Sequence, residues 1–291
     1  MKKIFLLLAL AAVALALAAE AQDEFSFGKI RKSELKKNDY HSSEAAVTLD
    51  EYVRIMPSLL NIQSFINDGQ TTPLIVREVV ARKVKILTND EANNKIQISL
   101  KNISPNEREN CEPHSVWANC YTLKNNRIIK RSLDIASIKR YKQADGSTFL
   151  EFEISNVQQG SIIEYGYTKA IVTESLDYTY TMQNTNSRCE VAINEQYAHL
   201  FDIKPVGKTI CRKQGEKKAL SNISYSSSVA QAGQALSGVG EHNGPSLSNA
   251  NTSRSSASTA LFALYVFSTE NLASPQEAEQ NSGITITLKQ K

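Results

Sequence analysis

The chain has 291 residues, of which 41% are hydrophobic and 22% charged, and its formal net charge is +3 at pH 7. These charges are scattered and nearly balanced, which excludes the basic stripe of a nucleic-acid-binding protein. A chain of this length can bury one large hydrophobic core or two small ones.

The first residues predict export. Lys2 and Lys3 precede an unbroken apolar run over residues 4–19, and the small-residue pattern Ala19-Glu20-Ala21 follows. This arrangement is typical of a secretory signal peptide, and the run is too short to span a bilayer comfortably. We expect a signal peptide at 1–21, a mature domain at 22–291 and a periplasmic, secreted or cell-surface location. An uncleaved N-terminal anchor is the alternative, and no later stretch approaches a transmembrane segment.

Two short helices are expected early in the mature chain. Residues 33–37 (SELKK) begin with a capping serine and an early glutamate. Residues 57–67 (PSLLNIQSFIN) space their apolar side chains as one face of a helix does, and Asp68-Gly69 would end it. We expect the second helix to pack on a sheet edge.

The dominant periodicity of the chain is two, which predicts β-strands. In residues 74–87, one face is predicted to be buried and the other solvated. The first face carries Val80, Arg82, Val84 and Ile86, and the second carries Val79, Ala81, Lys83 and Lys85. Further strands are predicted over 95–100, 121–133, 138–142, 148–154, 161–168, 176–183, 189–193, 200–204, 261–267 and 284–288.

Tight turns separate these strands. Asn125-Asn126 suits a two-residue hairpin, and Asp145-Gly146 is a second strong turn signal. About ten strands with turns every 8–12 residues predict a mainly β fold, an antiparallel two-layer β-sandwich with one or two short helices. Residues 221–258 are rich in Ser, Asn, Ala and Gly, and we expect a mobile loop inserted into this single domain.

Four cysteines fit an oxidising compartment. Four cysteines allow three pairings, and we favour the disulfides Cys111–Cys120 and Cys189–Cys211 because each closes a short loop, worth about 3 kcal/mol. The alternative is a metal site using His114, but the spacing differs from that of zinc sites and no metal or other cofactor is expected.

Four tyrosines stand at alternate positions of two successive predicted strands. They are Tyr165, Tyr167, Tyr178 and Tyr180. Facing inward they would be core pairs, which we favour; exposed, they would form a platform for a sugar or peptide ligand.

No arrangement of residues predicts an enzyme. The chain lacks H-E-x-x-H, G-x-S-x-G and phosphate-loop motifs. The alternative is a cryptic hydrolase that pairs Cys189 with His199. Glu151 and Glu153 could act as acid and base, but surface charges on a sheet are the expected role.

Short motifs of a recognisable kind run through nearly the whole mature chain. They are Phe27-Gly-Lys-Ile-Arg-Lys-Ser-Glu-Leu35, Ala46-Val-Thr-Leu, Arg82-Lys-Val-Lys-Ile-Leu, Tyr121-Thr-Leu-Lys-Asn-Asn-Arg-Ile-Ile-Lys, Gly160-Ser-Ile-Ile-Glu-Tyr-Gly-Tyr167, Phe267-Ser-Thr-Glu-Asn-Leu-Ala and Ile284-Thr-Ile-Thr-Leu. Together they resemble a bacterial envelope domain of unknown function that commonly precedes a transglutaminase-like, papain-type core.

The resemblance implies a β-sandwich in the bacterial envelope with no known activity of its own. The segment Tyr178-Thr-Tyr-Thr-Met-Gln183 lacks the tryptophan and proline usual in relatives, and the sequence contains no transglutaminase-like core. We therefore expect a non-catalytic binding or scaffolding domain with an unknown protein or glycan partner. A glycan- or peptidoglycan-binding module that uses the strand tyrosines is the alternative.

Overall fold

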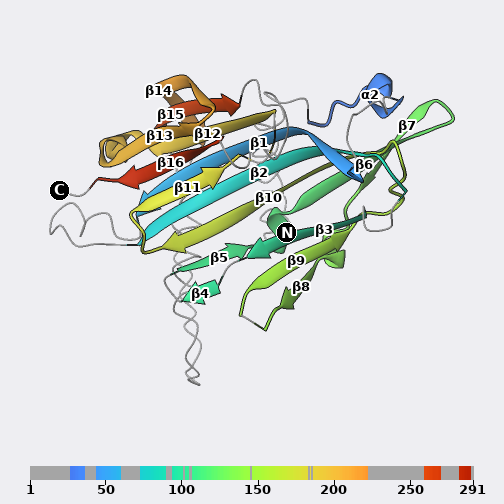
Figure 1. Cartoon of the computed structure of the whole chain (residues 1–291), viewed down its shortest axis with the longest axis horizontal. Coiled ribbons are helices and arrows are strands. Elements are labelled where there is room, and N and C mark those ends of the chain that lie inside the picture. Colours follow the sequence, from blue (N-terminus) through green and yellow to red (C-terminus); the bar gives the residue numbers. More distant parts are fainter. Residues whose placement is uncertain are drawn as a thin grey trace, which may run out of the picture.

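The structure is a computed structural model of the whole chain (Figure 1). It describes residues 27–36, 44–59, 73–89, 94–100, 102–104, 107–144, 146–182, 184, 186–221, 259–269 and 282–289. The expected signal peptide at 1–21 and most of the expected loop at 221–258 lie outside these residues.

A ten-stranded sheet forms the larger layer. In spatial order its main path is β14 (Thr209–Ser221), β15 (Thr259–Thr269), β12 (Ser187–Asn194), β1 (Ala46–Leu59), β2 (Leu74–Ile86), β10 (Ile162–Thr173), β5 (Glu107–Cys111) and β4 (Asn102–Ser104). Strand β10 also pairs with β6 (Trp117–Lys124), which pairs with β7 (Arg127–Ser132). All described pairs are antiparallel except β1 with β12, which is parallel.

Two three-stranded sheets form the second layer. One contains β11 (Asp177–Thr181), β16 (Ser282–Leu288) and β13 (Phe201–Gly207), and the other contains β3 (Lys95–Leu100), β9 (Thr148–Glu153) and β8 (Lys139–Lys142). The helical elements are α2 (Lys32–Lys36) and the 3-10 turns η2 (Pro113–Ser115), η3 (Ile135–Ser137) and η4 (Glu195–Leu200). Among the described helices, none is long and apolar enough to cross a membrane.

Both small sheets pack on the same face of the long sheet, which we call the inner face. Val53 of β1 and Val80 of β2 pack there with Ile286 of β16 in one core cluster. Ile163 of β10 packs with Leu150 of β9 in a second cluster. The predicted mainly β, two-layer sandwich is thereby confirmed, with the parallel β1–β12 pair as a departure from the antiparallel pattern.

The opposite, outer face of the long sheet departs from the predicted solvated face. Lys83 and Lys85 are buried, at 2% and 0% exposure. The segment 27–36, which we call the strap, covers this part of the sheet: Phe27 contacts Tyr52, Ala81 and Trp117, and its ring meets the Trp117 ring edge-on at 6.4 Å. The lysines are therefore covered by the chain itself, which alternation in sequence cannot reveal.

Polar contacts fasten the strap to the sheet. Lys85 Nζ donates to the carbonyl oxygens of Glu34, Leu35 and Gly160 at 2.9, 2.9 and 2.8 Å. The Gly28 amide donates to Glu164 Oε2 at 2.8 Å. The helix predicted at 33–37 corresponds to α2, and its Glu34 side chain accepts from the Arg31 amide at 2.6 Å.

Other local predictions have different outcomes. The helix expected at 57–67 is wrong at its start, because β1 continues through Pro57 to Leu59; its remainder lies outside the described residues. Asn125 and Asn126 adopt φ of 50° and 58° in the β6–β7 turn, as the hairpin prediction requires. Strands β14 and β15, which flank the low-complexity segment, pair with each other as far as Ser221 opposite Thr259.

Candidate functional site

A row of polar side chains crosses the inner face between the two small sheets. Strand register places Glu51 of β1 opposite Ser187 of β12 and Arg82 of β2, and Arg82 opposite Tyr165 of β10. Each of these side chains lies on the inner face, where the next residues on the same side of its strand are apolar core residues. The row therefore separates the two core clusters.

Glu51 is the centre of this row and is fully buried. Its Oε1 accepts from Arg82 Nε at 2.9 Å and from the Tyr180 hydroxyl at 3.3 Å, while its Oε2 accepts from Ser187 Oγ at 2.7 Å. Arg82 Nη1 reaches the Tyr165 hydroxyl at 3.4 Å. Because a buried carboxylate is costly without partners, these hydrogen bonds are what allow Glu51 to lie here.

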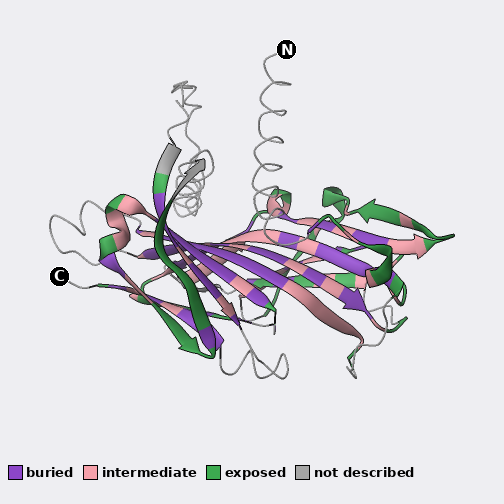
Figure 2. Cartoon of the chain, turned by 90° about the horizontal axis from the view of Figure 1, so that it is seen from above, coloured by how far each residue is buried: buried purple, intermediate pink, exposed green. Residues whose placement is uncertain are grey.

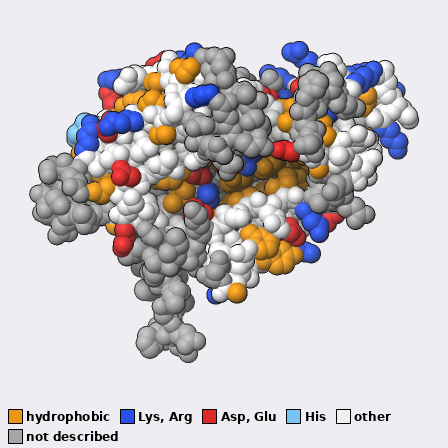
Figure 3. All heavy atoms as spheres, viewed as in Figure 1, with side chains coloured by type: hydrophobic (Ala, Val, Ile, Leu, Met, Phe, Trp, Pro, Cys, Tyr) orange, Lys and Arg blue, Asp and Glu red, His pale blue; other side chains and the backbone are white. Residues whose placement is uncertain are grey.

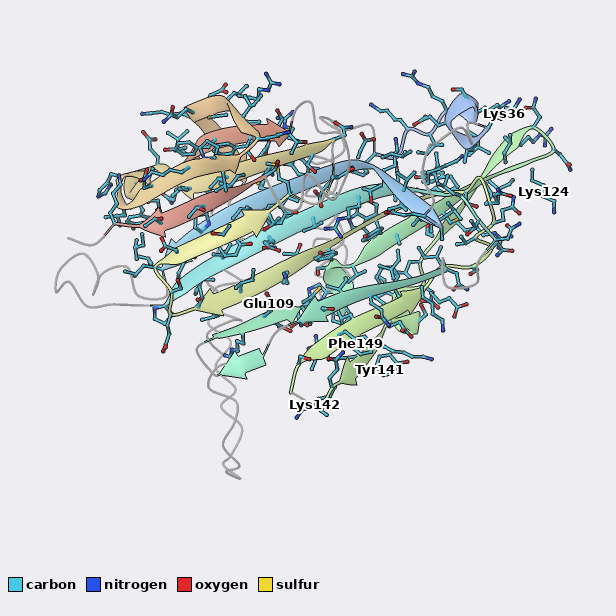
Figure 4. All side chains as sticks on the ribbon, viewed as in Figure 1. Lys36, Glu109, Lys124, Tyr141, Lys142 and Phe149 are labelled. Atoms are coloured by element: carbon cyan, nitrogen blue, oxygen red, sulfur yellow. The ribbon has the colours of Figure 1, made fainter. Side chains whose placement is uncertain are left out.

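A second polar group lies further along β2 and β10. Lys169 Nζ is 3.7 Å from Glu78 Oε2 and 3.4 Å from Glu109 Oε2 of β5. The Tyr178 hydroxyl of β11 donates to Glu78. Figure 4 labels Glu109 where β5 runs beside β10.

The four predicted tyrosines converge on these two polar groups. Tyr165 and Tyr167 come from β10, and Tyr178 and Tyr180 come from β11 in the facing sheet. Tyr167 packs against both core clusters. Tyr180 is buried, whereas the other three are partly exposed. The four tyrosines therefore lie between the two layers, with one edge of the group open. They are packed as core residues are, and three of them are also partly exposed, as a ligand platform requires.

Figure 3 shows a hollow in this part of the surface, between the two small sheets and above β2 and β10. Side chains of the hydrophobic class, in which the figure includes tyrosine, form its floor, and charged side chains lie beside it. The side chains of Arg82, Lys169 and Glu109 retain 19%, 17% and 13% exposure, so solvent reaches them. We call this hollow, with its four tyrosines and the charged residues that contact them, the tyrosine trough.

Burial also sets the ionisation of the trough. Burial raises the pKa of Glu78, and the ammonium group of Lys169 opposes that rise. Burial raises the pKa of the Tyr167 and Tyr180 hydroxyls, and Glu51 adds to the rise for Tyr180. Both hydroxyls therefore stay protonated at neutral pH and remain hydrogen-bond donors.

The two predicted disulfides are not formed, since all four cysteines are free thiols. Cys189 and Cys211 lie opposite the same residue, Phe267, on either side of β15. Two strand spacings separate their Cα atoms by about 10 Å, beyond disulfide reach.

The other predicted pair is also separated by the sheet register. Cys111 and Cys120 pair with the same edge of β10, opposite Lys169 and Ile163. Six residues of strand span about 20 Å, so the two sulfurs cannot meet.

The alternative thiol mechanism has no support in this geometry. Cys189 is buried in the core, and burial raises the pKa of its thiol well above the ordinary value. His199 is exposed on η4, and within the described part of the chain the two share no hydrogen bond. A protonated, enclosed thiol is a poor nucleophile.

The remaining candidate residues lie apart from the trough. Glu151 and Glu153 accept from Gln97 and Asn94, each at 2.8 Å, on the surface of β9. Among the described residues, no group of three or more His, Cys, Asp or Glu could hold a metal ion.

The charged members of the trough were missed by sequence reasoning. Arg82 is a cation between Val80 and Val84 on the face predicted to be buried, which signals a buried partner. Glu78, between Val76 and Val80, carries the same kind of signal, which was not used. Glu51 and Glu109 lie on strands that the sequence did not predict, so their place on the inner face was not foreseen.

No family model and no curated protein matches the sequence. Among solved structures, a proposed protease from Parabacteroides distasonis has a TM-score of 0.44 and 9% identity, over 84% of this chain and 40% of that one. An M1 zinc metallopeptidase from Deinococcus radiodurans has a TM-score of 0.36 and 8% identity, over 84% and 42% of the two chains. A proposed nutrient-binding protein from Legionella pneumophila has a TM-score of 0.31 and 9% identity, over 84% and 68%. The chain spans less than half the length of the first two proteins, and likenesses at these scores assign it no activity.

Proposed function

We propose that this chain is an exported, non-catalytic binding module of the bacterial envelope, and that the tyrosine trough holds a wall glycan. One observation carries the proposal: four tyrosines converge with ion-paired carboxylates and cations in a single, partly open hollow. The N-terminal sequence and the resemblance to an envelope domain support the location.

The chemistry of the trough suits a sugar. Aromatic rings offer flat apolar faces to the C–H faces of a pyranose, and fixed polar groups orient its hydroxyls. Glu78 and Glu109 supply acceptors, and Lys169 supplies a donor between them. Because these groups already hold one another by ion pairs, they offer hydrogen bonds of defined direction.

The binding test uses the full chain and purified peptidoglycan sacculi as the probe. We expect co-sedimentation with sacculi, and a loss of affinity of about two- to twelvefold in Tyr165→Ala and in Tyr178→Ala, since a lost aromatic contact costs about 0.5–1.5 kcal/mol. Tyr141→Ala is the matched control, because Tyr141 is an exposed tyrosine on β8 that stacks on Phe149 at 5.0 Å (Figure 4).

Thermal unfolding of each variant separates binding from folding. If both trough variants bind sacculi as well as the control does, the trough is not the ligand site. If binding falls only in proportion to the fraction unfolded, the tyrosines serve the core alone. Competition by N-acetylglucosamine oligomers rather than by free stem peptide would identify the sugar as the ligand.

A further inference from the structure

One end of the molecule carries a concentration of positive charge. The strap and the β6–β7 hairpin lie together there, with Lys36 and Lys124 at the same end of the molecule (Figures 1 and 4). Strap helix α2 packs against β6. The exposed cations of these two segments are Lys29, Arg31, Lys32, Lys36, Lys124, Arg127, Lys130 and Arg131. We call this set the basic end.

The charge of the basic end is not balanced within its own two segments, and the nearest carboxylate from another strand, Glu164 of β10, is fully buried. Glu34 is the single carboxylate in residues 27–36 and 117–132, and it is engaged by Lys83 Nζ at 3.3 Å. Eight cations against one carboxylate give a surplus of seven, compared with +3 for the whole chain. None of the eight forms an ion pair with a carboxylate that the structure describes. The rest of the chain is therefore net negative, and the molecule is strongly polarised.

Protection of a sheet edge explains only part of this charge. Within the described chain, β7 pairs with β6 alone and so forms an edge. Cations on an edge strand discourage pairing with other chains, which accounts for Arg127 and Arg131. The four cations of the strap lie on a different element that has no edge to protect. Most of β7 and the hairpin turn are exposed, and Figure 2 shows exposed green ribbon at this end of the molecule.

The hairpin also presents an apolar side chain among its cations. Ile129 is 36% exposed, and alternation along β7 places it between Arg127 and Arg131 on one side of the strand. Lys130 points to the other side, with its Nζ 5.9 Å from the centre of the Tyr121 ring. The cations therefore surround the hairpin instead of converging on one point.

We propose that the basic end docks on the surface of an anionic lipid bilayer. The negative potential of an anionic bilayer acts on every cation within about a Debye length of its surface, so it attracts cations that point in different directions without requiring them to converge. Ile129 adds a small apolar anchor at the headgroup level. A single bound phosphate would need donors that converge, and these diverge. The trough lies at the middle of the long sheet, so docking by this end would leave it open (Figures 1 and 3).

The test measures co-sedimentation of the full chain with vesicles of phosphatidylcholine containing about one-third phosphatidylglycerol, against pure phosphatidylcholine. We expect binding to the anionic vesicles only, weakened by added salt. The triple variant Arg127→Glu, Lys130→Glu, Arg131→Glu should bind more than tenfold more weakly.

A charge-matched control distinguishes this site from net charge. Arg212→Glu, Lys213→Glu, Lys217→Glu makes the same change on exposed positions of β14, at the other end of the sheet (Figure 1). Thermal unfolding verifies that both triple variants remain folded, and the control should bind anionic vesicles within about threefold of the original chain.

Three outcomes would overturn the proposal. They are equal losses in the two triple variants, equal binding to both kinds of vesicle, and binding of soluble dextran sulfate through the hairpin without binding of vesicles. The last result would identify a soluble polyanion as the partner.

Discussion

Glu51 of the long sheet accepts a hydrogen bond from the Tyr180 hydroxyl of the facing sheet, at 3.3 Å. The same carboxylate accepts from Arg82 on its neighbouring strand and from Ser187 on β12. One side chain thus connects three strands of one layer to a strand of the other. This contact and the hydrogen bond from Tyr178 to Glu78 join β11, one wall of the tyrosine trough, to side chains of the long sheet.

We predict that Glu51→Leu destabilises the protein by about 3–5 kcal/mol, because it leaves the Arg82 guanidinium without its buried carboxylate partner. Urea unfolding followed by circular dichroism measures the change. Glu51→Gln should cost less, since the amide oxygen still accepts a hydrogen bond. The double variant Glu51→Leu, Arg82→Met should cost less than the sum of its single changes. Simple additivity would show that the two residues are not coupled.

The four thiols give a second prediction. Cys111, Cys120 and Cys189 are each 1% exposed, whereas Cys211 is exposed. Burial raises the pKa of Cys111 to about 11, so its reactive thiolate is scarce at neutral pH. An aromatic disulfide reagent should therefore react rapidly with one thiol in the native protein and with four in denaturant without reductant.

The variant Cys211→Ser should lose the rapid reaction and retain three thiols in denaturant. Fewer than four thiols in the unfolded original chain would instead reveal a disulfide. That result would require a strand register different from the one described here.

Lys85 gives a third prediction, on pH dependence. Burial lowers the pKa of Lys85 to about 8 in the folded state, against about 10.4 in the unfolded chain. Between these values the unfolded state binds more protons, so this lysine makes the free energy of unfolding rise with pH. Below about pH 8 both states hold the proton, and the cost of burying the charge is fully present.

The variant Lys85→Met should lack this rise. Denaturant midpoints for the original chain and the variant, compared from about pH 7 to 10, isolate Lys85 because other groups cancel in the difference. Between about pH 7 and 10, we expect the free energy of unfolding of the original chain to rise by about 2–3 kcal/mol relative to that of Lys85→Met. A flat difference for Lys85→Met would mean that the pKa is not lowered.

How much of this structure follows from sequence depends on whether a residue's partner is local. Alternation correctly places Val80 and Arg82 on the inner face, because period two is a property of the strand itself. The burial of Lys83 was missed because the strap that covers it lies about fifty residues away, and Lys83 pairs with Glu34 from there. Strand β1 was missed as a whole, because its charged residues Glu51 and Arg54 interrupt an apolar pattern.

The disulfide prediction failed for a related reason. Cys111 and Cys120 are close in sequence, which suggests that a disulfide would close a short loop. The chain between them passes through η2, and the two cysteines then pair with distant positions of β10. The common orientation of the tyrosines could be predicted, because alternate residues of a strand point to the same face whichever strands pair with it. Their ionic partners come from β1, β2 and β5, and only the fold identifies them.

A fourth prediction concerns Gly166, which lies between Tyr165 and Tyr167 but faces the outer side of β10. A Cβ built there would stand 2.6 Å from the Val80 carbonyl oxygen and 2.6 Å from Trp117 Nε1. The indole can shift, but the carbonyl belongs to the sheet backbone and cannot. We therefore expect Gly166→Ala to destabilise the protein by about 1–3 kcal/mol, as overpacking does.

Urea unfolding measures this cost, and Thr168→Ala, two positions along the same face of β10, is the matched control that removes atoms instead of adding them. Because β10 carries two of the four trough tyrosines, Tyr165 and Tyr167, a strand displaced by the new methyl group should also weaken binding to sacculi. The additional change Trp117→Phe tests which neighbour resists. It should recover little of the lost stability if the Val80 carbonyl is the obstacle, and most of it if the indole is.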